Sequence, residues 1–566
     1  MAQATRRSFL TAAAALVATS TSNQAAAAIP ETRKDVASDF LNILRTPDRA
    51  VAYAEPFTAK KPSRRVLSRS GSKWEASGIQ VRSVATADSL PIVITAPTVP
   101  LVRMHLRWIV RPSPASLYLG DAWERSYGEL AWRSIVPERV LPWYFAAHNG
   151  QTTHTYGVRT GAAALCFWQV DPEGVSLWLD LSNGGSGVLL GQREIAAATV
   201  MSRQGTPGET PLESLKGLCR LLCPHPRLPA EPVFGSNDWY YAYGNNTADG
   251  ILRDTDLIAL LAPTAGPRPF SVIDAGWEGN PRFPDMAQLA KQIRSHRARP
   301  GIWIRPTEAP KSAPKNLLLP SVRLRSQSAR DNEFAYDPTI PEALELMLAK
   351  VRQVVGWKYD LIKHDFSTYD LLGQWGFDMG AQPTLPGWSF HDRSRTNAEI
   401  ILDLYKSIRA AAGENTLLLG CNTVAHQAAG LFEIQRSGDD TSGREWERTR
   451  RMGVNTLAYR LPQHRTFFDL DADCVGITTA IPWELNRQWL DLLARSGTSL
   501  FLSPGPDATG SEQKAAIKNA FAIASAGDST GLATDWLAET TPEQWDFKGA
   551  PKRYAWSPDG ADPFST

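Results

Sequence analysis

Lys363, His364 and Asp365 end a short apolar segment, YDLIKHDF at residues 359–366, whose length and composition predict a buried strand. Charged side chains are costly in a protein core unless they are paired or used in chemistry. Residues two apart on a strand share a face, so Lys363 and Asp365 point one way and His364 points the other. A lysine beside an aspartate favours the ionised carboxylate, which can act as a nucleophile. A purely structural ion pair is the alternative interpretation.

A second carboxylate is required if Asp365 is a nucleophile. Asp439 is the candidate, in the segment LFEIQRSGDD at the end of another apolar run, and its neighbour Asp440 stays open as the acid/base. Two carboxylates of different character, one ionised and one able to hold a proton, are what glycoside hydrolysis needs. In the structural alternative, Asp440 or Ser442 caps the helix predicted from REWERTRR.

Polar and reactive side chains follow the other apolar segments of this region as well. Barrel enzymes place their chemistry at the carboxyl ends of their strands, so we expect five successive strand ends to build one site. The residues at these ends are Asp274 and Trp277, Trp303 and Arg305, Lys363 and Asp365, Cys421 and Asn422, and Arg436, Asp439 and Asp440.

The region from 229 to 530 alternates short apolar strands with amphipathic helices. For example, FSVIDAGW is followed by DMAQLAKQIRSHRA, and YDLIKHDF leads to NAEIILDLYKSIRAAAG. Such alternation predicts parallel strands. Over about 300 residues, we expect a catalytic (β/α)8 TIM barrel. A doubly wound open sheet is the rival fold, but no glycine-rich phosphate loop follows the first strand.

The regions on both sides of the barrel are predicted to be β-structures, which makes the protein multidomain. Residues 31–228 contain short segments rich in β-branched and aromatic residues, as in an antiparallel β-sandwich. A proline-rich linker, HPRLPAEPVFG, leads from them into the barrel. The last stretch, residues 531–566, is short and aromatic, and we expect it to add a few β-strands.

The bulk composition describes an ordinary globular protein without a polyanionic partner. The 566 residues include 60 basic and 58 acidic side chains, and no basic run is long enough for nucleic acid. Five cysteines are too few for a disulfide framework. Cys219 and Cys223 precede His225 without a fourth metal ligand, so we interpret LCRLLCPHP as a helix end packed on the core.

The N-terminus resembles a twin-arginine signal peptide over residues 1–28. Arg6 and Arg7 precede a short, alanine-rich apolar segment with a cleavage site near Ala28. This segment is too short for a good membrane span, and no later stretch approaches ~20 apolar residues. We therefore expect a periplasmic or secreted protein that has no membrane contact after signal cleavage.

In their order along the chain, these motifs resemble those of the retaining α-galactosidase clan, specifically glycoside hydrolase family 36, with its melibiase-type enzymes and raffinose-synthase relatives. NDWYYAYG at residues 237–244 is similar to the family's first barrel strand. DAGW, KHD and RSGDD match its Asp-Asp-Gly-Trp, Lys-Trp-Asp and Arg-x-Ser-Asp-Asp motifs, and Cys421 matches the cysteine of its Cys-x-Gly-Gly motif. YLGDAWERSYGEL at residues 118–130 is similar to a segment of the family's sandwich. The resemblance covers most of the chain and implies an N-terminal sandwich, a catalytic barrel and a C-terminal β domain.

The resemblance implies a role for each matched residue. Asp365 is the expected nucleophile and Asp439 the expected acid/base. The three tryptophans of the set either stack on the sugar or pack in the core. The expected substrate-binding residues are Asp274, Trp277, Trp303, Arg305, Lys363, Cys421, Arg436, Asp440 and Trp239.

Two departures from the family pattern bear on sugar specificity. In the family, a pair of aspartates recognises the axial 4-hydroxyl and the 6-hydroxyl of galactose, and the second aspartate of this pair is Ala275 here. The glycines that follow the family's cysteine are replaced by NTVAHQ after Cys421. Both changes alter the sugar pocket that the resemblance implies.

We therefore expect a retaining α-glycoside hydrolase, most similar to an α-galactosidase, that acts on an oligosaccharide or polysaccharide and needs no metal or organic cofactor. A raffinose-synthase-like transglycosylase and an α-glycosidase of other sugar specificity are alternatives that use the same two carboxylates. The alternative from another class is a non-catalytic carbohydrate-binding protein. The presence of both Asp365 and Asp439 argues against it.

Overall fold

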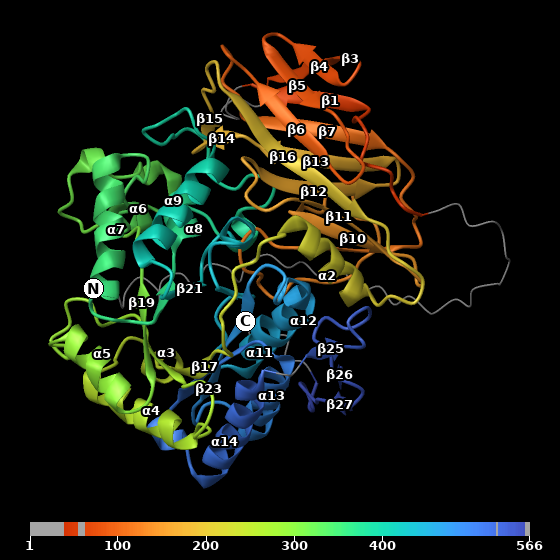
Figure 1. Cartoon of the computed structure of the whole chain (residues 1–566). Helices are drawn as coiled ribbons and strands as arrows, with labels where there is room; N and C mark the ends of the chain where they lie inside the picture. Colours follow the sequence, from red (N-terminus) through yellow and green to blue (C-terminus); the bar gives the residue numbers. More distant parts are fainter. Residues whose placement is uncertain (1–38, 55–62, 528–529, 561–566) are drawn as a thin grey trace.

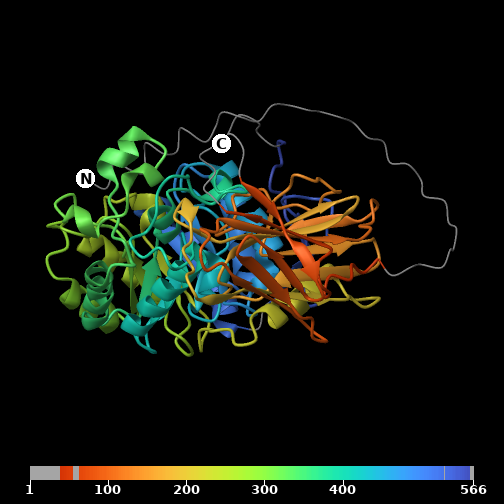
Figure 2. The same cartoon turned by 90° about the horizontal axis from the view of Figure 1, so that it is seen from above.

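The computed structural model describes residues 39–54, 63–527 and 530–560. A β-sandwich, a closed barrel with surrounding helices and a small third sheet lie against one another (Figure 1). From above, the sandwich lies beside the barrel (Figure 2). The three parts follow the predicted order, and the predicted signal peptide at 1–28 lies outside the described residues.

Two antiparallel sheets form the predicted sandwich. Burial alternates along β5 (Ile79–Ser83) and β6 (Leu90–Thr95), so that side chains such as Ile92 and Ile94 enter the core. One sheet contains, in order, β2 (Arg64–Val66), β1 (Arg49–Tyr53), β7 (Arg103–Ile109), β13 (Gly174–Asp180), β12 (Leu165–Asp171) and β9 (Leu141–Pro142). The other contains β3 (Ser68–Ser70), β4 (Lys73–Ala76), β5, β6, β16 (Glu194–Arg203), β11 (Thr153–Val158), β10 (Tyr144–His148) and β8 (Leu117–Gly120). β14 (Ser182–Asn183) and β15 (Ser186–Gly187) form a separate pair.

Helix α2 (Pro211–Leu222) connects the sandwich to the barrel. A capping box between Thr210 and Glu213 starts the helix, with proline in its first turn. Its apolar face packs on β11 and β16. Cys219 lies on that face and Cys223 directly follows the helix, both buried with free thiols. This confirms the predicted helix end packed on the core.

Eight parallel strands close into a barrel in sequence order, which confirms the (β/α)8 fold over the open sheet. Apolar side chains of successive strands, such as Val272, Leu361, Leu419 and Phe501, fill its interior. The strands are β17 (Phe234–Asn237), β18 (Phe270–Ile273), β19 (Arg299–Ile304), β20 (Leu361–His364), β21 (Leu417–Gly420), β22 (Ile434–Arg436), β23 (Asp469–Ile477) and β24 (Ser499–Pro504).

Helices connect the barrel strands. The α-helices are α3 (Trp239–Ala242), α4 (Ala248–Leu261), α5 (Met286–Ser295), α6 (Gln327–Asn332), α7 (Pro341–Gly356), α8 (Ser367–Leu372), α9 (Asn397–Ala412), α10 (Ala425–Ala428), α11 (Trp446–Thr449), α12 (Thr456–Arg460), α13 (Trp483–Ser496) and α14 (Ser511–Ala526). Short 3-10 turns are η1 (Lys315–Leu317), η2 (Ser321–Arg323), η3 (Gly376–Asp378), η5 (Leu461–Gln463) and η6 (Pro506–Ala508), and η4 (Arg450–Asn455) is a π-helix. Within the described residues, no helix has the length and apolar composition to cross a membrane.

The end of the chain adds the few strands expected from its sequence. β25 (Gly531–Ala533), β26 (Gln544–Phe547) and β27 (Pro551–Arg553) form an antiparallel sheet. Trp545 of β26 and Trp556 after β27 are buried, and the Trp446 indole N–H donates to the Trp556 carbonyl at 2.7 Å. The small sheet is thereby anchored to the barrel through α11.

Residues 121–128 of the sandwich, here called the sandwich loop, reach the carboxyl end of the barrel. The Ser126 N–H donates to the Ser437 carbonyl at 3.0 Å, and the Asp439 N–H donates to the Ser126 carbonyl at 2.8 Å. Behind this bridge, Arg460 pairs with Asp121 at 2.9 Å. The sandwich loop therefore supports the backbone after β22, where two of the predicted site residues lie.

Candidate active site

Lys363 and His364 lie on strand β20, directly before Asp365, and their side chains alternate as predicted. Lys363 points toward the barrel axis, where its Nζ lies 2.7 Å from Asp274 Oδ2. Burial would lower the pKa of the Lys363 ammonium, but the Asp274 carboxylate outweighs burial and raises it. His364 points the other way and packs on Tyr405 and Phe432, where burial lowers its pKa to about 4. Lys363 therefore pairs with the residue at the end of β18.

Asp365 is held by N–H donors from three places in the chain. The Trp303 indole donates to its Oδ2 at 3.0 Å, and the backbone N–H groups of Phe366 and Asn422 donate to its Oδ1 at 2.8 and 3.1 Å. An ionised carboxylate only accepts hydrogen bonds, so these donors suit that form. They also fix the direction of the carboxylate, which a nucleophile requires.

Asp439 and Asp440 lie in the loop after β22 and differ in their contacts. Arg125 and Arg448 each approach one carboxylate oxygen of Asp439 at 2.7 Å. The contacts of Asp440 include Arg436 at 3.4 Å and Arg125 at 3.6 Å, and its side chain is 27% exposed against 15% for Asp439. Arg125 therefore contacts both aspartates, and Asp439 is the more buried of the two.

Neither aspartate caps the helix that follows. Helix α11 starts at Trp446, and its N-cap residue, Glu445, makes no side-chain cap bond. The Ser442 hydroxyl instead accepts the N–H groups of Arg444 and Glu445 at 2.9 and 3.0 Å. The residue that caps α11 is therefore neither aspartate, and Ser442 stabilises the turn that leads into the helix.

Arg436 and Cys421 lie between the two carboxylate-bearing loops. Arg436 is fully buried, with contacts of 3.5 Å to Cys421 Sγ and 2.9 Å to Asp473. Burial, followed by the nearby Asp365 charge, raises the pKa of the Cys421 thiol, so it stays neutral. Arg125 also contacts this sulfur, at 3.7 Å.

Arg125 and Glu124 of the sandwich loop are site residues that sequence reasoning missed. Glu124 accepts hydrogen bonds from the Asn422 amide, the Tyr127 hydroxyl and, at 3.2 Å, the Gly376 N–H. Since Asn422 also donates its backbone N–H to Asp365, Glu124 fixes a neighbour of the expected nucleophile. The charged pair in the WERSYG motif was the available signal, but nothing in the sequence placed this segment at the barrel mouth.

Asp473 on β23 is another residue that the sequence did not single out. It has a left-handed backbone, φ 72°, next to a register shift between Asp471 and Cys474. Its Oδ2 accepts from the Tyr240 hydroxyl and, at 2.7 Å, from the Thr441 N–H, in addition to its pair with Arg436. The β-bulge directs this carboxylate at Arg436 and fixes that guanidinium at the site.

Two predicted residues, Trp277 and Arg305, have other surroundings. Trp277 packs edge-on against Trp357 in the hydrophobic core, 5.8 Å between ring centroids. Arg305 is bound by Asp370 at 2.9 Å and by Glu333 at 2.8 Å. The structure therefore does not bring Trp277 and Arg305 into contact with Asp365.

Trp239 lies at the start of α3 and packs against the apolar cluster inside the barrel, next to Tyr243. It is half-buried and near the strand ends. Asn237, two residues before it, donates to Asp274 Oδ2 at 2.9 Å and shares that carboxylate with Lys363.

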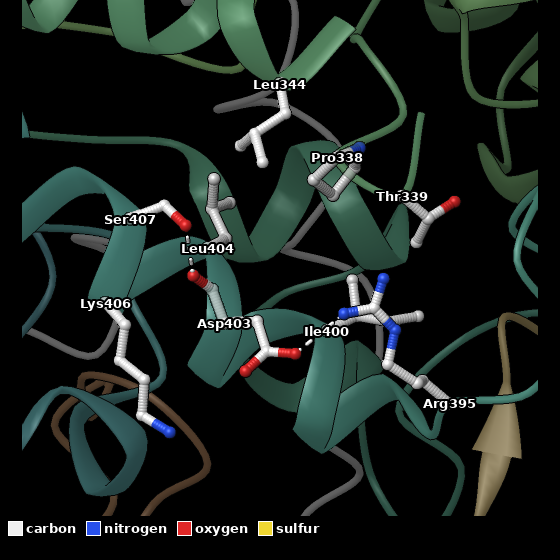
Figure 3. A pocket seen from close by; sticks show the side chains of 9 residues that line it. All are labelled: Pro338, Thr339, Leu344, Arg395, Ile400, Asp403, Leu404, Lys406 and Ser407. Carbon is white, nitrogen blue, oxygen red and sulfur yellow. Dashed lines mark hydrogen bonds and ion pairs between the residues drawn. The ribbon is translucent and has the colours of Figure 1, made fainter. Parts of the chain in front are cut away.

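A separate pocket of about 250 Å³ lies outside the barrel between α7 and α9 (Figure 3). Leu344 and Leu404 line it, beside an ion pair of 2.7 Å between Arg395 and Asp403. Asp403 is the one acidic side chain among its described lining residues, so this pocket holds no carboxylate pair. Across the described part of the chain, no group of three or more His, Cys, Asp or Glu is arranged to hold a metal ion.

The fold is similar to that of several solved structures, two of which are named α-galactosidases. An α-galactosidase from Thermus thermophilus, solved with p-nitrophenyl α-D-galactopyranoside, superposes with a TM-score of 0.57 at 19% identity, over 87% of this chain and 97% of that one. The family 36 α-galactosidase AgaA from Geobacillus stearothermophilus, solved with 1-deoxygalactonojirimycin, gives 0.55 at 11% identity, over 89% and 77%.

A third similar structure has another activity in its name. The cycloalternan-degrading enzyme from Trueperella pyogenes, in complex with isomaltose, gives a TM-score of 0.52 at 11% identity, over 88% of this chain and 86% of that one. No protein-family model and no curated protein matches the sequence. At these identities the similarity establishes a shared fold over most of the chain.

Proposed function

We propose that the protein is a retaining α-glycoside hydrolase whose nucleophile is Asp365. One observation carries the proposal: the ends of β20 and β22 converge on a single network. Asp365 is bound by Asn422, the neighbour of Cys421, while Arg125 links Cys421 to Asp439. Two carboxylate-bearing loops joined in this way provide the pair of groups that glycoside hydrolysis needs.

In the proposed mechanism, Asp365 attacks the anomeric carbon and the glycosidic bond breaks, which leaves a β-linked glycosyl-enzyme. The acid/base carboxyl donates its proton to the departing oxygen and later takes one from water, which releases a sugar of retained α configuration. In such enzymes the two carboxyl groups lie ~5–5.5 Å apart. Asp274, fixed by Lys363 and Asn237, is placed to bind sugar hydroxyls.

The acid/base role has two candidates. The motif match favours Asp439. However, both oxygens of Asp439 are paired with arginines at 2.7 Å, and a proton on either one would disrupt a pair. Asp440 is the more exposed of the two carboxylates, at 27% against 15%, so a departing oxygen and an incoming water reach it more readily.

Asparagine variants separate these candidates. Without its acid, a retaining enzyme still cleaves p-nitrophenyl glycosides, because p-nitrophenolate leaves unaided, but it loses activity on oligosaccharides. We expect Asp440→Asn to show this split, a drop of about 100-fold on an oligosaccharide and much less on the p-nitrophenyl glycoside. The opposite result, with the split in Asp439→Asn alone, assigns the role to Asp439.

We propose α-galactosides as the first substrate class to test, since two of the three similar structures carry α-galactosidase in their names. The alanine at position 275 and the isomaltose in the third structure favour an alternative, an α-glycosidase of other sugar specificity. A transglycosylase shares the mechanism up to the glycosyl-enzyme, after which a sugar hydroxyl replaces water.

The deciding experiment is a panel of p-nitrophenyl α-glycosides with the native protein and with Asp365→Ala. Asp360→Ala is the control, because it removes a carboxylate just before the same strand, where Asp360 pairs with Arg294 at 2.7 Å. We expect release from at least one α-glycoside, loss of at least 1000-fold in Asp365→Ala, and native-like rates in the control. Sugar binding without turnover in all three proteins would instead support the carbohydrate-binding alternative.

The proposal includes export by the twin-arginine route. All five cysteines are buried with free thiols, which suits a protein that folds in the reducing cytoplasm before export. N-terminal sequencing of the exported protein tests it, with cleavage expected near Ala28. A protein that stays uncleaved in the cytoplasm would refute this part.

A further inference from the structure

Five aromatic side chains, here called the aromatic rim, gather at the carboxyl end of the barrel beside the candidate active site. They come from the sandwich loop, from the residues after β20 and from η3. Tyr369 and Trp375 lie 4.8 Å apart, Phe366 and Trp375 5.7 Å, and Tyr127 and Phe377 5.8 Å, between ring centroids. The rim therefore spans the junction between sandwich and barrel.

The aromatic rim is continuous with both carboxylate-bearing loops. Phe366 directly follows Asp365 in the chain. The Arg125 guanidinium lies 5.7 Å from the ring centroids of Tyr127 and Trp375 and pairs with Asp439 at 2.7 Å. The rim therefore adjoins Asp365 along the chain and reaches Asp439 through the single side chain of Arg125.

The turn that presents the exposed end of the rim is held against the sandwich. Gly376 has a φ of 52°, and a Cβ at this position would lie 2.8 Å from the Tyr127 ring, so only glycine allows this approach. Its N–H donates to Glu124 at 3.2 Å. The side chain of the next residue, Phe377, is 68% exposed. Single exposed aromatic residues are ordinary on protein surfaces, but this one extends a row that begins at the site.

We propose that the aromatic rim binds the leaving-group part of the substrate, a sugar ring or aryl group that lays its flat apolar face on Trp375 and Phe377. The inference rests on the proposed function and assigns the site next to the cleaved bond. Aromatic rings offer large, rigid apolar contact areas, and ligand sites are commonly lined with them. The acid/base must reach the departing oxygen, so the leaving group lies on the side of Asp439, Asp440 and Arg125, where the rim begins.

The experiment compares leaving groups of different size on one variant. Phe377→Ala is suitable because the exposed side chain contributes little to the core. Leu260→Ala on α4 is the matched control, as its side chain is 76% exposed and distant from the site. Each protein is assayed with an α-glycosyl fluoride, a p-nitrophenyl α-glycoside and an oligosaccharide of the sugar that the native protein accepts. Fluoride is too small to touch the rim.

We expect Phe377→Ala to lower kcat/KM about fivefold for the aryl glycoside and the oligosaccharide, and to leave the glycosyl fluoride within about twofold of the native rate. Phe377→Tyr should restore the loss, and Leu260→Ala should change none of the three. An equal loss on the fluoride, or no loss on any substrate, overturns the inference. A native protein that turns over none of the three substrates refutes the proposed function itself, and the inference with it.

Discussion

Glu124 shows how a single buried residue couples the candidate site to pH. Burial raises the pKa of its carboxyl from 4.5 to about 7, although the charge of Arg125 acts in the opposite direction. Between these two pH values the folded protein keeps a proton on Glu124 that the unfolded chain has released. A rise in pH therefore favours the unfolded chain, and the contribution of Glu124 to stability falls as pH rises from 4.5 to 7.

This sign gives a prediction for Glu124→Gln. The free energy of unfolding of the native protein minus that of the variant should fall between pH 4.5 and 7, by on the order of 3 kcal/mol. Urea unfolding at several pH values measures it, with the exposed Glu138→Gln as control. Titration of other groups cancels in the difference. A difference that stays constant with pH would show that Glu124 is ionised throughout.

At the scale of elements, the sandwich loop makes the sandwich part of the site. Arg125 is buried and contacts Asp439, Asp440 and Cys421, which follow two different barrel strands. Without its guanidinium, these groups lose their common partner. We therefore expect Arg125→Met to lower kcat by about 10- to 100-fold, because small misplacements of catalytic groups cost that much.

The control for Arg125→Met is Arg133→Met, since Arg133 lies in the same region of the sandwich with an exposed side chain. Initial-rate kinetics with circular dichroism and thermal unfolding separate a local effect from loss of the fold. Equal kcat values for the two variants would mean that the sandwich loop supports the barrel without serving the chemistry.

The sequence predicted the elements of the barrel correctly, but it did not predict the contacts that other parts of the chain make with the site. The alternation of apolar strands with helices predicted the closed barrel, because periodicity along the chain reports which face of each element is buried. The alternation of side chains along a strand correctly predicted that Lys363 and His364 point in opposite directions. The ion partner of Lys363 is Asp274, however, and Glu124 and Arg125 reach the site from another domain. Such contacts depend on tertiary docking, which no local pattern encodes.

We expected the residues at the carboxyl ends of the barrel strands to build one site, and this expectation fits some of them and not others. It placed Asp274, Asp365, Cys421 and Arg436 in one network, as the structure shows. It also selected Trp277, four residues beyond the end of β18, which packs in the hydrophobic core. A strand fixes the direction of its own side chains, whereas the residues after it follow the loop.

At the scale of the whole molecule, the reactivity of the five cysteine thiols measures how well the packing of the domains excludes reagents. They come from the sandwich, from α2 and the residue that follows it, from the residue after β21 and from β23, and all five are buried: Cys166, Cys219, Cys223, Cys421 and Cys474. The thiolate is the form that reacts with disulfide reagents, and burial raises the pKa of each of these thiols.

We expect the folded protein to react with none of its five thiols on the timescale of minutes, and the protein in urea to react with all five. A time course with an aromatic disulfide reagent counts them. One fast thiol in the folded protein would contradict the packing, and its position would identify the part that opens. If that thiol were Cys421 and the sugar product slowed its reaction, the opening would lie at the candidate active site. A Cys421→Ser variant would then lose the fast phase, whereas Cys166→Ser, a change in the sandwich core, would keep it.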